Sequence, residues 1–210
     1  MMLKVENILE VEKYINDLEA VIFDLDDTLY SEKQYVRSGY RKIADYFGRP
    51  EMEDEMWDVF EAGGKAIDNV LEKHGLISKK SEALHIYRSQ IPDIELYQGV
   101  SEMIARIKKN KKVGIITDGR PEGQRAKLKV LGIEVDKVIV TDELGGIEFR
   151  KPNPRGFRLM MKELDVDFSK ACYVGDNRSK DFIAPQKLGM RCIWFRNRDG
   201  IYNLGERKQR

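Results

Sequence analysis

The chain has 210 residues, of which 41% are hydrophobic and 35% charged, a composition typical of folded globular proteins and unlike that of disordered ones. Its 37 basic and 36 acidic residues leave a net charge of +1, which excludes a general electrostatic attraction to nucleic acid or to an anionic membrane. Residues 1–6 lack the apolar core of a signal peptide, and no apolar run is long enough to span a bilayer.

The first predicted elements are a short helix and a buried strand. Apolar residues spaced among acids and lysines over residues 6–19 predict an amphipathic helix. The next stretch, Ala20–Phe23, has four consecutive apolar residues before a turn, the pattern of a strand buried on both faces in a parallel sheet. Three carboxylates follow, those of Asp24, Asp26 and Asp27. Because strand side chains alternate, Asp24 and Asp26 should project to the same side.

This acidic turn is the first candidate site. It falls at the carboxyl end of a strand, where open α/β sheets bind their ligands. Like charges this close require positive charge among them, and a set of oxygen ligands favours Mg²⁺. Taken by itself, the stretch also fits a solvated acidic turn without a function.

A purely helical block follows the acidic turn. Between residues 32 and 97 apolar residues recur every three or four positions in four groups, separated by glycines and a proline. Because the pattern outside this block alternates between strands and helices, we predict an inserted all-helical cap domain of residues 31–97 and an α/β core domain of residues 1–30 and 98–210. Polar and aromatic side chains of the block could read a substrate, namely Arg37, Arg41, Tyr35, Tyr40, Lys65, His74 and His85.

Alternation resumes after residue 98. The patterns predict helices over 100–107, 122–131, 157–164 and 181–188, and strands over 112–117, 138–141, 171–174 and 192–195. With the first strand, these elements predict an α/β fold with a doubly wound, parallel, five-stranded, Rossmann-like sheet. The tail from Arg196, with Arg198, Arg207, Lys208 and Arg210, is expected to be a solvated end.

The chain has two cysteines, Cys172 and Cys192, each inside an apolar, strand-like run. Two cysteines supply neither a zinc site nor a disulfide framework, and buried cysteine usually behaves as a small hydrophobic residue. We therefore expect reduced core residues in a cytoplasmic protein.

Three later strand ends also carry polar residues. Thr117 and Asp118 precede a small-residue turn that opens a helix, an arrangement that can bind phosphate. Lys151 lies in a loop and is restrained by Pro152. The fourth strand is followed by a glycine turn with Asp176 and, five residues later, Asp181, which could instead only cap the next helix.

In this order the four segments resemble the motifs of the haloacid dehalogenase (HAD) superfamily of phosphatases and phosphotransferases. The stretch Asp24-Leu25-Asp26-Asp27-Thr28 is similar to the first motif and Thr117 to the second. Lys151 before Pro152 is similar to the third motif, and Gly175-Asp176 through Asp181 to the fourth. The helical block resembles the C1-type cap of that family, and the likeness covers residues 20–195.

The resemblance implies a Mg²⁺-dependent phosphomonoester hydrolase. Asp24 would attack phosphorus and form an aspartyl-phosphate, and Asp26 would protonate the leaving alcohol and then deprotonate water. The implied Mg²⁺ ligands are Asp24, the main-chain carbonyl of Asp26, Asp176 and, directly or through a neighbour, Asp181. Thr117, the backbone N–H of Asp118 and Lys151 would hold the phosphoryl group.

Several alternatives stay open at this point. The acid at position 26 disfavours a dehalogenase, which has no leaving alcohol to protonate, but a phosphomutase and a non-catalytic binding or regulatory module both remain. The expected substrate is a small phosphorylated metabolite, such as a sugar phosphate, a nucleoside monophosphate or an intermediate of surface-polysaccharide synthesis. The sequence does not indicate an oligomeric state.

Overall fold

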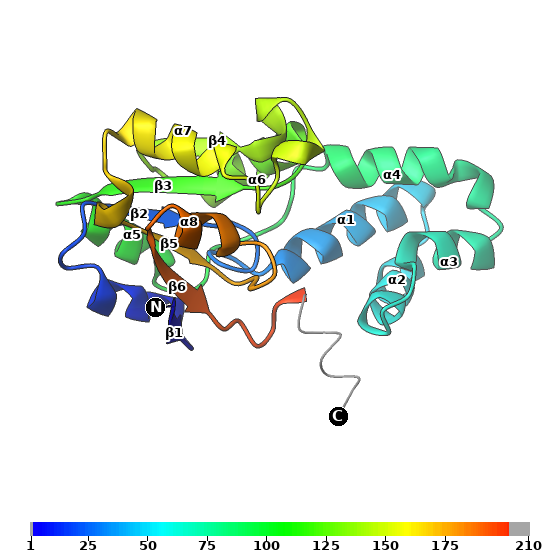
Figure 1. Ribbon diagram of the computed structural model, residues 1–210. Helices are drawn as coiled ribbons and strands as arrows, with labels where there is room; N and C mark the ends of the chain where they lie inside the picture. The colour runs from blue at the N-terminus through cyan, green and yellow to red at the C-terminus, as the bar shows by residue number, and fades with distance from the viewer. Residues whose placement is uncertain (1, 202–210) are drawn as a thin grey trace.

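The computed structural model describes residues 2–201 and shows two parts, a sheet with helices on both faces and a group of four helices beside it (Figure 1). The sheet has six strands in the order β1-β6-β5-β2-β3-β4, and every pair of neighbours is parallel. This confirms the predicted doubly wound α/β fold. The strands are β1 Met2–Val5, β2 Ala20–Phe23, β3 Lys112–Thr117, β4 Lys137–Val140, β5 Ala171–Gly175 and β6 Arg191–Phe195.

The predicted number of five strands was wrong, because β1 was missed. This strand is four residues long and lies at the edge of the sheet beside β6. Val5 is the only buried residue of this strand. A short edge strand with one buried residue has no recognisable hydrophobic alternation. The amphipathic element expected after it is a 3₁₀ helix, η1 (Ile8–Tyr14), which begins at a capping box made by Asn7 and Glu10.

Helices cover both faces of the sheet because the side chains of each strand alternate between the two faces. In β2, Val21 and Phe23 belong to one apolar core with η1 and α5, whereas Ala20 and Ile22 belong to the other with α7 and α8. The helices of this part are α5 Val100–Lys108, α6 Pro121–Leu131, α7 Arg155–Leu164 and α8 Ile183–Lys187, with short 3₁₀ turns η3 Thr141–Leu144, η4 Ile147–Phe149 and η5 Phe168–Lys170.

The last helix begins later than predicted. Its first residue is Ile183, and its N-cap is Phe182, so Asp181 is not a helix cap. The Asp181 carboxylate instead accepts a hydrogen bond at 2.9 Å from the backbone N–H of Asn177. Asp181 is therefore held within its own loop and is available to the site described below.

The four helices of the inserted block share a core of their own. Ile43, Met52, Met56 and Leu71 are fully buried there, as the spacing of apolar residues predicted. The chain enters and leaves this block side by side, since the backbone N–H of Tyr97 donates to the carbonyl of Leu29 at 3.0 Å. The helices are α1 Glu32–Phe47, α2 Glu51–Glu61, α3 Ala66–Lys73 and α4 Lys80–Ser89, with the short 3₁₀ turn η2 Ile77–Lys79 before α4.

The prediction of a solvated end from Arg196 onward was wrong for Asn197. Asn197 is buried, and its side-chain amide donates to the carbonyl of Asp27 and to the hydroxyl of Tyr97, both at 2.8 Å. Arg198 is exposed and pairs with Glu6 at 3.2 Å. Asn197 thus ties the beginning of this segment to the turn after β2. Arg207, Lys208 and Arg210 lie outside the described residues.

Both cysteines are buried free thiols in neighbouring strands, which confirms that part of the prediction. Within residues 2–201, none of the helices has the length and apolar character that crossing a bilayer would require.

The strand order positions the site. From the central strand β2 the chain continues to β3 and β4 on one side, then returns to β5 and β6 on the other. In an open parallel sheet this reversal leaves a crevice at the carboxyl ends of the central strands. The loops after β2, β3, β4 and β5 carry the polar residues that the sequence analysis singled out.

Candidate active site

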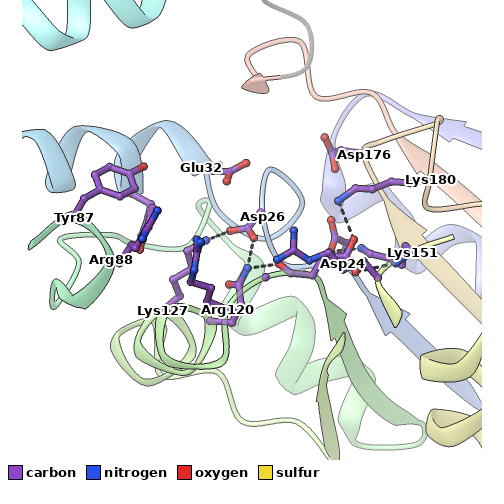
Figure 2. Close-up of a pocket in the computed structure, with 16 residues that line it drawn as sticks. Asp24, Asp26, Glu32, Tyr87, Arg88, Arg120, Lys127, Lys151, Asp176 and Lys180 are labelled. Carbon is purple, nitrogen blue, oxygen red and sulfur yellow. Dashed lines mark hydrogen bonds and ion pairs between the residues drawn. The ribbon is translucent and has the colours of Figure 1, made fainter. Parts of the chain in front are cut away.

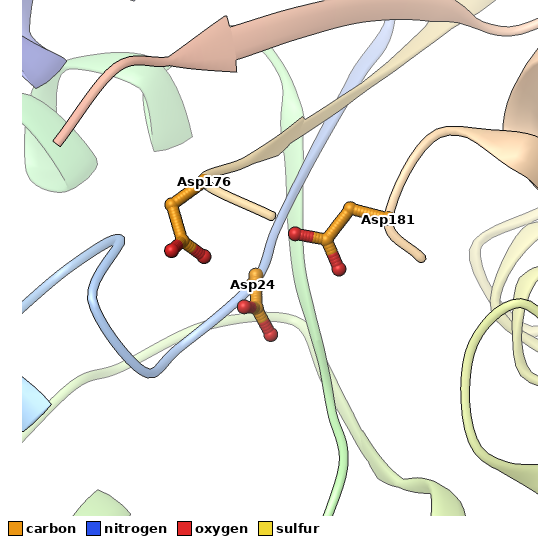
Figure 3. Close-up of side chains that lie close together, drawn as sticks. All are labelled: Asp24, Asp176 and Asp181. Carbon is orange, nitrogen blue, oxygen red and sulfur yellow. The ribbon is translucent and has the colours of Figure 1, made fainter. Parts of the chain in front are cut away.

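Three carboxylates from two strand ends converge in this crevice (Figure 3). Asp24 directly follows β2, and Asp176 and Asp181 lie in the loop after β5. Each offers an oxygen, and the three oxygens lie within 4.8 Å of one another. Glycine is required at position 175, the last residue of β5, because a Cβ there would lie 2.5 Å from the carboxylate of Asp181.

Lys151 supplies the positive charge nearest to these acids. Its side chain is fully buried, and its Nζ lies 2.6 Å from Asp24 Oδ1 and 2.9 Å from Asp181 Oδ1. It also donates to the hydroxyl of Tyr173 at 2.9 Å. Burial disfavours the ammonium, yet Asp181 and Asp24 together raise the pKa of Lys151 well above its ordinary value. Lys151 is therefore a fixed cation that joins the loop after β4 to the acids.

One lysine does not balance three acids. Burial raises the pKa of Asp24 to about 7, with Asp181 adding to the rise and Lys151 opposing it. Burial and the charges of Asp24 and Asp181 raise the pKa of Asp176 to about 9. Carboxylates that resist ionising together, and that offer only oxygen ligands, fit a hard divalent cation such as Mg²⁺. The donor set of this site thus agrees with the expected metal.

Asp26 also lines the crevice but has different partners (Figure 2). Its Oδ1 accepts from Lys127 Nζ at 2.7 Å and from the Tyr30 hydroxyl at 2.5 Å, and its Oδ2 accepts from Gln124 Nε2 at 2.8 Å. Burial opposes ionisation, but Lys127 and these hydrogen bonds hold the pKa of Asp26 below its ordinary value. The pKa of Asp24 is thus raised and that of Asp26 lowered, although the two residues are only two positions apart.

The end of β3 contributes a hydroxyl and a further ion pair. Thr117 is fully buried, and its hydroxyl has no hydrogen-bond partner among the described residues. Asp118 accepts from the backbone N–H of Lys151 at 3.0 Å and from Lys180 Nζ at 3.1 Å. An unsatisfied buried hydroxyl is costly, so Thr117 is suited to a ligand oxygen that enters the crevice.

A cavity of about 460 Å³ is lined by both parts of the chain and reaches Asp24, Asp26, Asp118, Lys151 and Asp176. Thr117 and Asp181 are fully buried beside it and do not belong to its lining. Of the seven polar and aromatic residues considered in the helical block, Tyr35 alone belongs to its lining. Arg37 and Arg41 pair with Glu53 instead, and His74 pairs with Glu55. Tyr40 is buried in the helical core, and Lys65 and His85 are exposed.

The sequence analysis missed several residues that line this cavity. Among them, Gln124 and Lys127 had a usable signal, because they share the buried face of α6 with Leu131. Polar residues at helical spacing on a buried face require a polar partner. The others carried no local signal, and they are Glu32, Tyr87, Arg88, Arg120, Gly123, Arg150 and Lys180.

Comparison with known proteins identifies the family of the chain. Residues 21–195 match the model of the haloacid dehalogenase-like hydrolase family. The chain belongs to this family. It is therefore a hydrolase, and the matched residues include both strands of the sheet and the helical block.

Several similar proteins of the HAD-like family are phosphatases. A glyceraldehyde 3-phosphate phosphatase of Methanocaldococcus jannaschii is 27% identical over 82% of this chain and 82% of its own. A protein of the same name from Pyrococcus abyssi is 33% identical, but the chain spans only 41% of that protein's length. A pyrimidine 5′-nucleotidase of Escherichia coli is 23% identical over 83% of this chain and 84% of its own.

Solved structures of HAD-like proteins share the fold. A HAD-superfamily hydrolase of Geobacter sulfurreducens superposes with a TM-score of 0.64 at 17% identity, covering 83% of this chain and 85% of that one. A HAD phosphatase of Thermococcus onnurineus gives a TM-score of 0.54 at 22% identity, covering 91% and 98%.

Proposed function

We propose that this HAD-like hydrolase is a Mg²⁺-dependent phosphomonoester hydrolase that acts on a small phosphorylated metabolite through an aspartyl-phosphate. The observation that supports this most is the contact of Lys151 Nζ with both Asp24, at 2.6 Å, and Asp181, at 2.9 Å. Lys151 thereby joins the loops after β2, β4 and β5 around the carboxylate of Asp24, which would attack phosphorus. The separate environment of Asp26 supplies a second carboxylate for proton transfer.

In the first step, an oxygen of Asp24 attacks phosphorus, and the bond between phosphorus and the leaving oxygen breaks. Asp26 takes up a proton when the negative phosphoryl group enters the cavity, and it gives that proton to the leaving oxygen. This step produces the free alcohol and an aspartyl-phosphate on Asp24. In the second step, Asp26 takes a proton from water, the water oxygen attacks phosphorus, and Asp24 leaves with inorganic phosphate as the product.

The remaining residues bind and orient the phosphoryl group. Lys151, the hydroxyl of Thr117 and the backbone N–H of Asp118 would hold its oxygens, and fixed donors of this kind stabilise charge in the transition state. Asp24, Asp176, Asp181 and the main-chain carbonyl of Asp26 would hold Mg²⁺. When bound, Mg²⁺ supplies the charge that lets an anionic nucleophile approach an anionic phosphate.

We assign residues 31–97 as a cap domain of the C1 type that covers the substrate. The separate core of α1–α4 supports this assignment, as do Glu32, Tyr35, Tyr87 and Arg88, which reach the cavity from that side. The cap would exclude water and contact the leaving group.

The substrate proposed is a sugar phosphate or a nucleoside monophosphate. The similar proteins named as glyceraldehyde 3-phosphate phosphatase and pyrimidine 5′-nucleotidase support these two classes. We place the enzyme in the cytoplasm, where two buried free thiols stay reduced, with neither nucleic acid nor a membrane as a partner.

A phosphate-release screen tests this function. Triose, pentose and hexose phosphates and nucleoside monophosphates would be incubated with the protein, with Mg²⁺ or with EDTA. We expect release from at least one compound with Mg²⁺, loss of release with EDTA, and none from Asp24→Asn. Absence of release from every compound with Mg²⁺ would contradict the proposal, and isomerised hexose phosphate without free phosphate would indicate a phosphomutase.

A further inference from the structure

A buried lysine on α6 faces the second carboxylate of the site. The side chain of Lys127 is 5% exposed, and its Nζ lies 2.7 Å from Asp26 Oδ1 (Figure 2). A buried ammonium is stable only beside a fixed negative charge, so the two groups hold each other in place. Lys127 lies 101 residues from Asp26 in the sequence and on a different element.

The hydrogen bonds to Asp26 distinguish its two oxygens. Oδ1 accepts from Lys127 and from the hydroxyl of Tyr30, whereas Oδ2 accepts only from Gln124 among the described residues. A carboxylate oxygen has two lone pairs. Oδ1 is therefore saturated, and Oδ2 keeps one position for a proton.

Lys127 is itself held between the two parts of the chain. Its Nζ lies 4.2 Å from the ring centroid of Tyr35, which belongs to α1, and a cation over an aromatic ring is stabilised. The Tyr35 ring packs edge-on against that of Tyr87 on α4, with centroids 5.7 Å apart. Gln124, one turn before Lys127 on α6, completes the contact with Asp26.

We infer that Lys127 is a positioning residue for proton transfer, which fixes Oδ1 of Asp26 so that Oδ2 meets the leaving oxygen of the substrate. This inference rests on the proposed function. When the phosphorus–oxygen bond to the alcohol breaks, the proton on Oδ2 passes to the alcohol oxygen, and in the second step Oδ2 receives a proton from water. Lys127 keeps its protons throughout, and of the two carboxylates proposed to react, Asp24 and Asp26, it pairs with Asp26.

The test compares two substrates of similar size, p-nitrophenyl phosphate and benzyl phosphate. Nitrophenolate leaves without a proton, whereas benzyl alcohol requires one. For Lys127→Met we expect kcat/KM to fall by about 100-fold with benzyl phosphate and by less than about threefold with p-nitrophenyl phosphate, since general acid catalysis contributes this much. A merely structural role would lower both values equally. The quantity kcat/KM is chosen because it reports the step in which the leaving group departs.

Three further variants make the result decisive. Asp26→Asn should show the same split, and Lys129→Met, which removes an exposed lysine of the same helix, should behave like the wild type. Should Lys127→Met fail to fold, Lys127→Gln keeps a donor without the charge and should still show a split of about tenfold. Equal losses on both substrates would overturn the inference. Absence of phosphate release by the wild type from these two substrates and from every compound of the metabolite screen would overturn the proposed function and the inference with it.

Discussion

The carboxylate of Asp27 holds Ile201, since Asp27 Oδ2 accepts a hydrogen bond at 2.7 Å from the backbone N–H of Ile201. The other oxygen of the same carboxylate accepts from the backbone N–H of Glu32, the first residue of α1, at 3.0 Å. Asp27 is fully buried and adopts a left-handed conformation with φ 52. One side chain thus ties together the turn after β2, the start of the helical block and the end of the described chain.

Replacing Asp27 with Ala should therefore destabilise the fold. Two half-buried N–H groups lose their acceptor, and the net loss for each such hydrogen bond is about 1 kcal/mol. Urea unfolding followed by circular dichroism measures the free energy of unfolding. Asp27→Asn is the matched control, because asparagine keeps one acceptor oxygen and tolerates the left-handed conformation, so its loss should be smaller. A free energy for Asp27→Ala within about 0.5 kcal/mol of the wild type would contradict this role.

Asp24→Asn should abolish turnover without unfolding the chain. Removal of a nucleophile lowers kcat by more than about 10³-fold. The amide has nearly the same shape, and it relieves the crowding of charges around Asp176 and Asp181, so the melting temperature should not fall. Phosphate release and a thermal melt on the same preparation measure both effects. Substantial residual activity would show that another group attacks phosphorus.

Lys151→Met should destabilise the protein strongly. The substitution leaves Asp24 and Asp181 without their buried counter-charge, which costs about 3–5 kcal/mol. Mg²⁺ should stabilise this variant more than the wild type, because a bound cation replaces the missing charge. Denaturant unfolding with and without Mg²⁺ measures the difference. A loss below about 1 kcal/mol without Mg²⁺ would mean that solvent already screens the acids.

Magnesium binding should strengthen as pH rises from 6 to 8. The raised pKa values of Asp24, about 7, and of Asp176, about 9, mean that the metal-free site holds protons that Mg²⁺ must displace. Calorimetric titration at several pH values measures the affinity, and we expect a gain of about tenfold or more over this range. Asp176→Asn should weaken binding and flatten this dependence. An affinity that is independent of pH would argue against Asp24 and Asp176 as the ligands.

The raised pKa of Glu32 should make the free energy of unfolding depend on pH. Burial, aided by the charge of Asp26, raises the pKa of its carboxyl group from 4.5 to about 8. The folded chain therefore binds a proton that the unfolded chain releases between these values, so the free energy of unfolding falls as pH rises through this window. Glu32→Gln cannot ionise and should be more stable than the wild type at pH 8.5, with a much smaller difference at pH 5.

Thermal melts across this pH range test the prediction for Glu32. The matched control is Glu61→Gln, which neutralises an exposed acid on α2 and should follow the wild type at each pH. A constant difference between Glu32→Gln and the wild type from pH 5 to 8.5 would show that Glu32 ionises normally in the folded protein.

The sequence determined the features that depend on short stretches of chain. Strands buried on both faces, such as Ala20–Phe23, are continuous apolar runs, and the four motifs lie at the carboxyl ends of strands or in the loops that follow them. Parallel strands bring those ends to one edge, and for this reason the contact of Lys151 with Asp24 was within reach of sequence reasoning.

Only the tertiary structure decided which distant residues surround those motifs. The edge strand β1 buries too little apolar surface to leave a pattern, and the contact of Ile201 with Asp27 joins positions 174 residues apart. Lys127 is likewise an ordinary lysine in the sequence until the packing of α6 brings it 2.7 Å from Asp26. Hydrophobic periodicity reports which face of an element is buried, but not which charge that face meets.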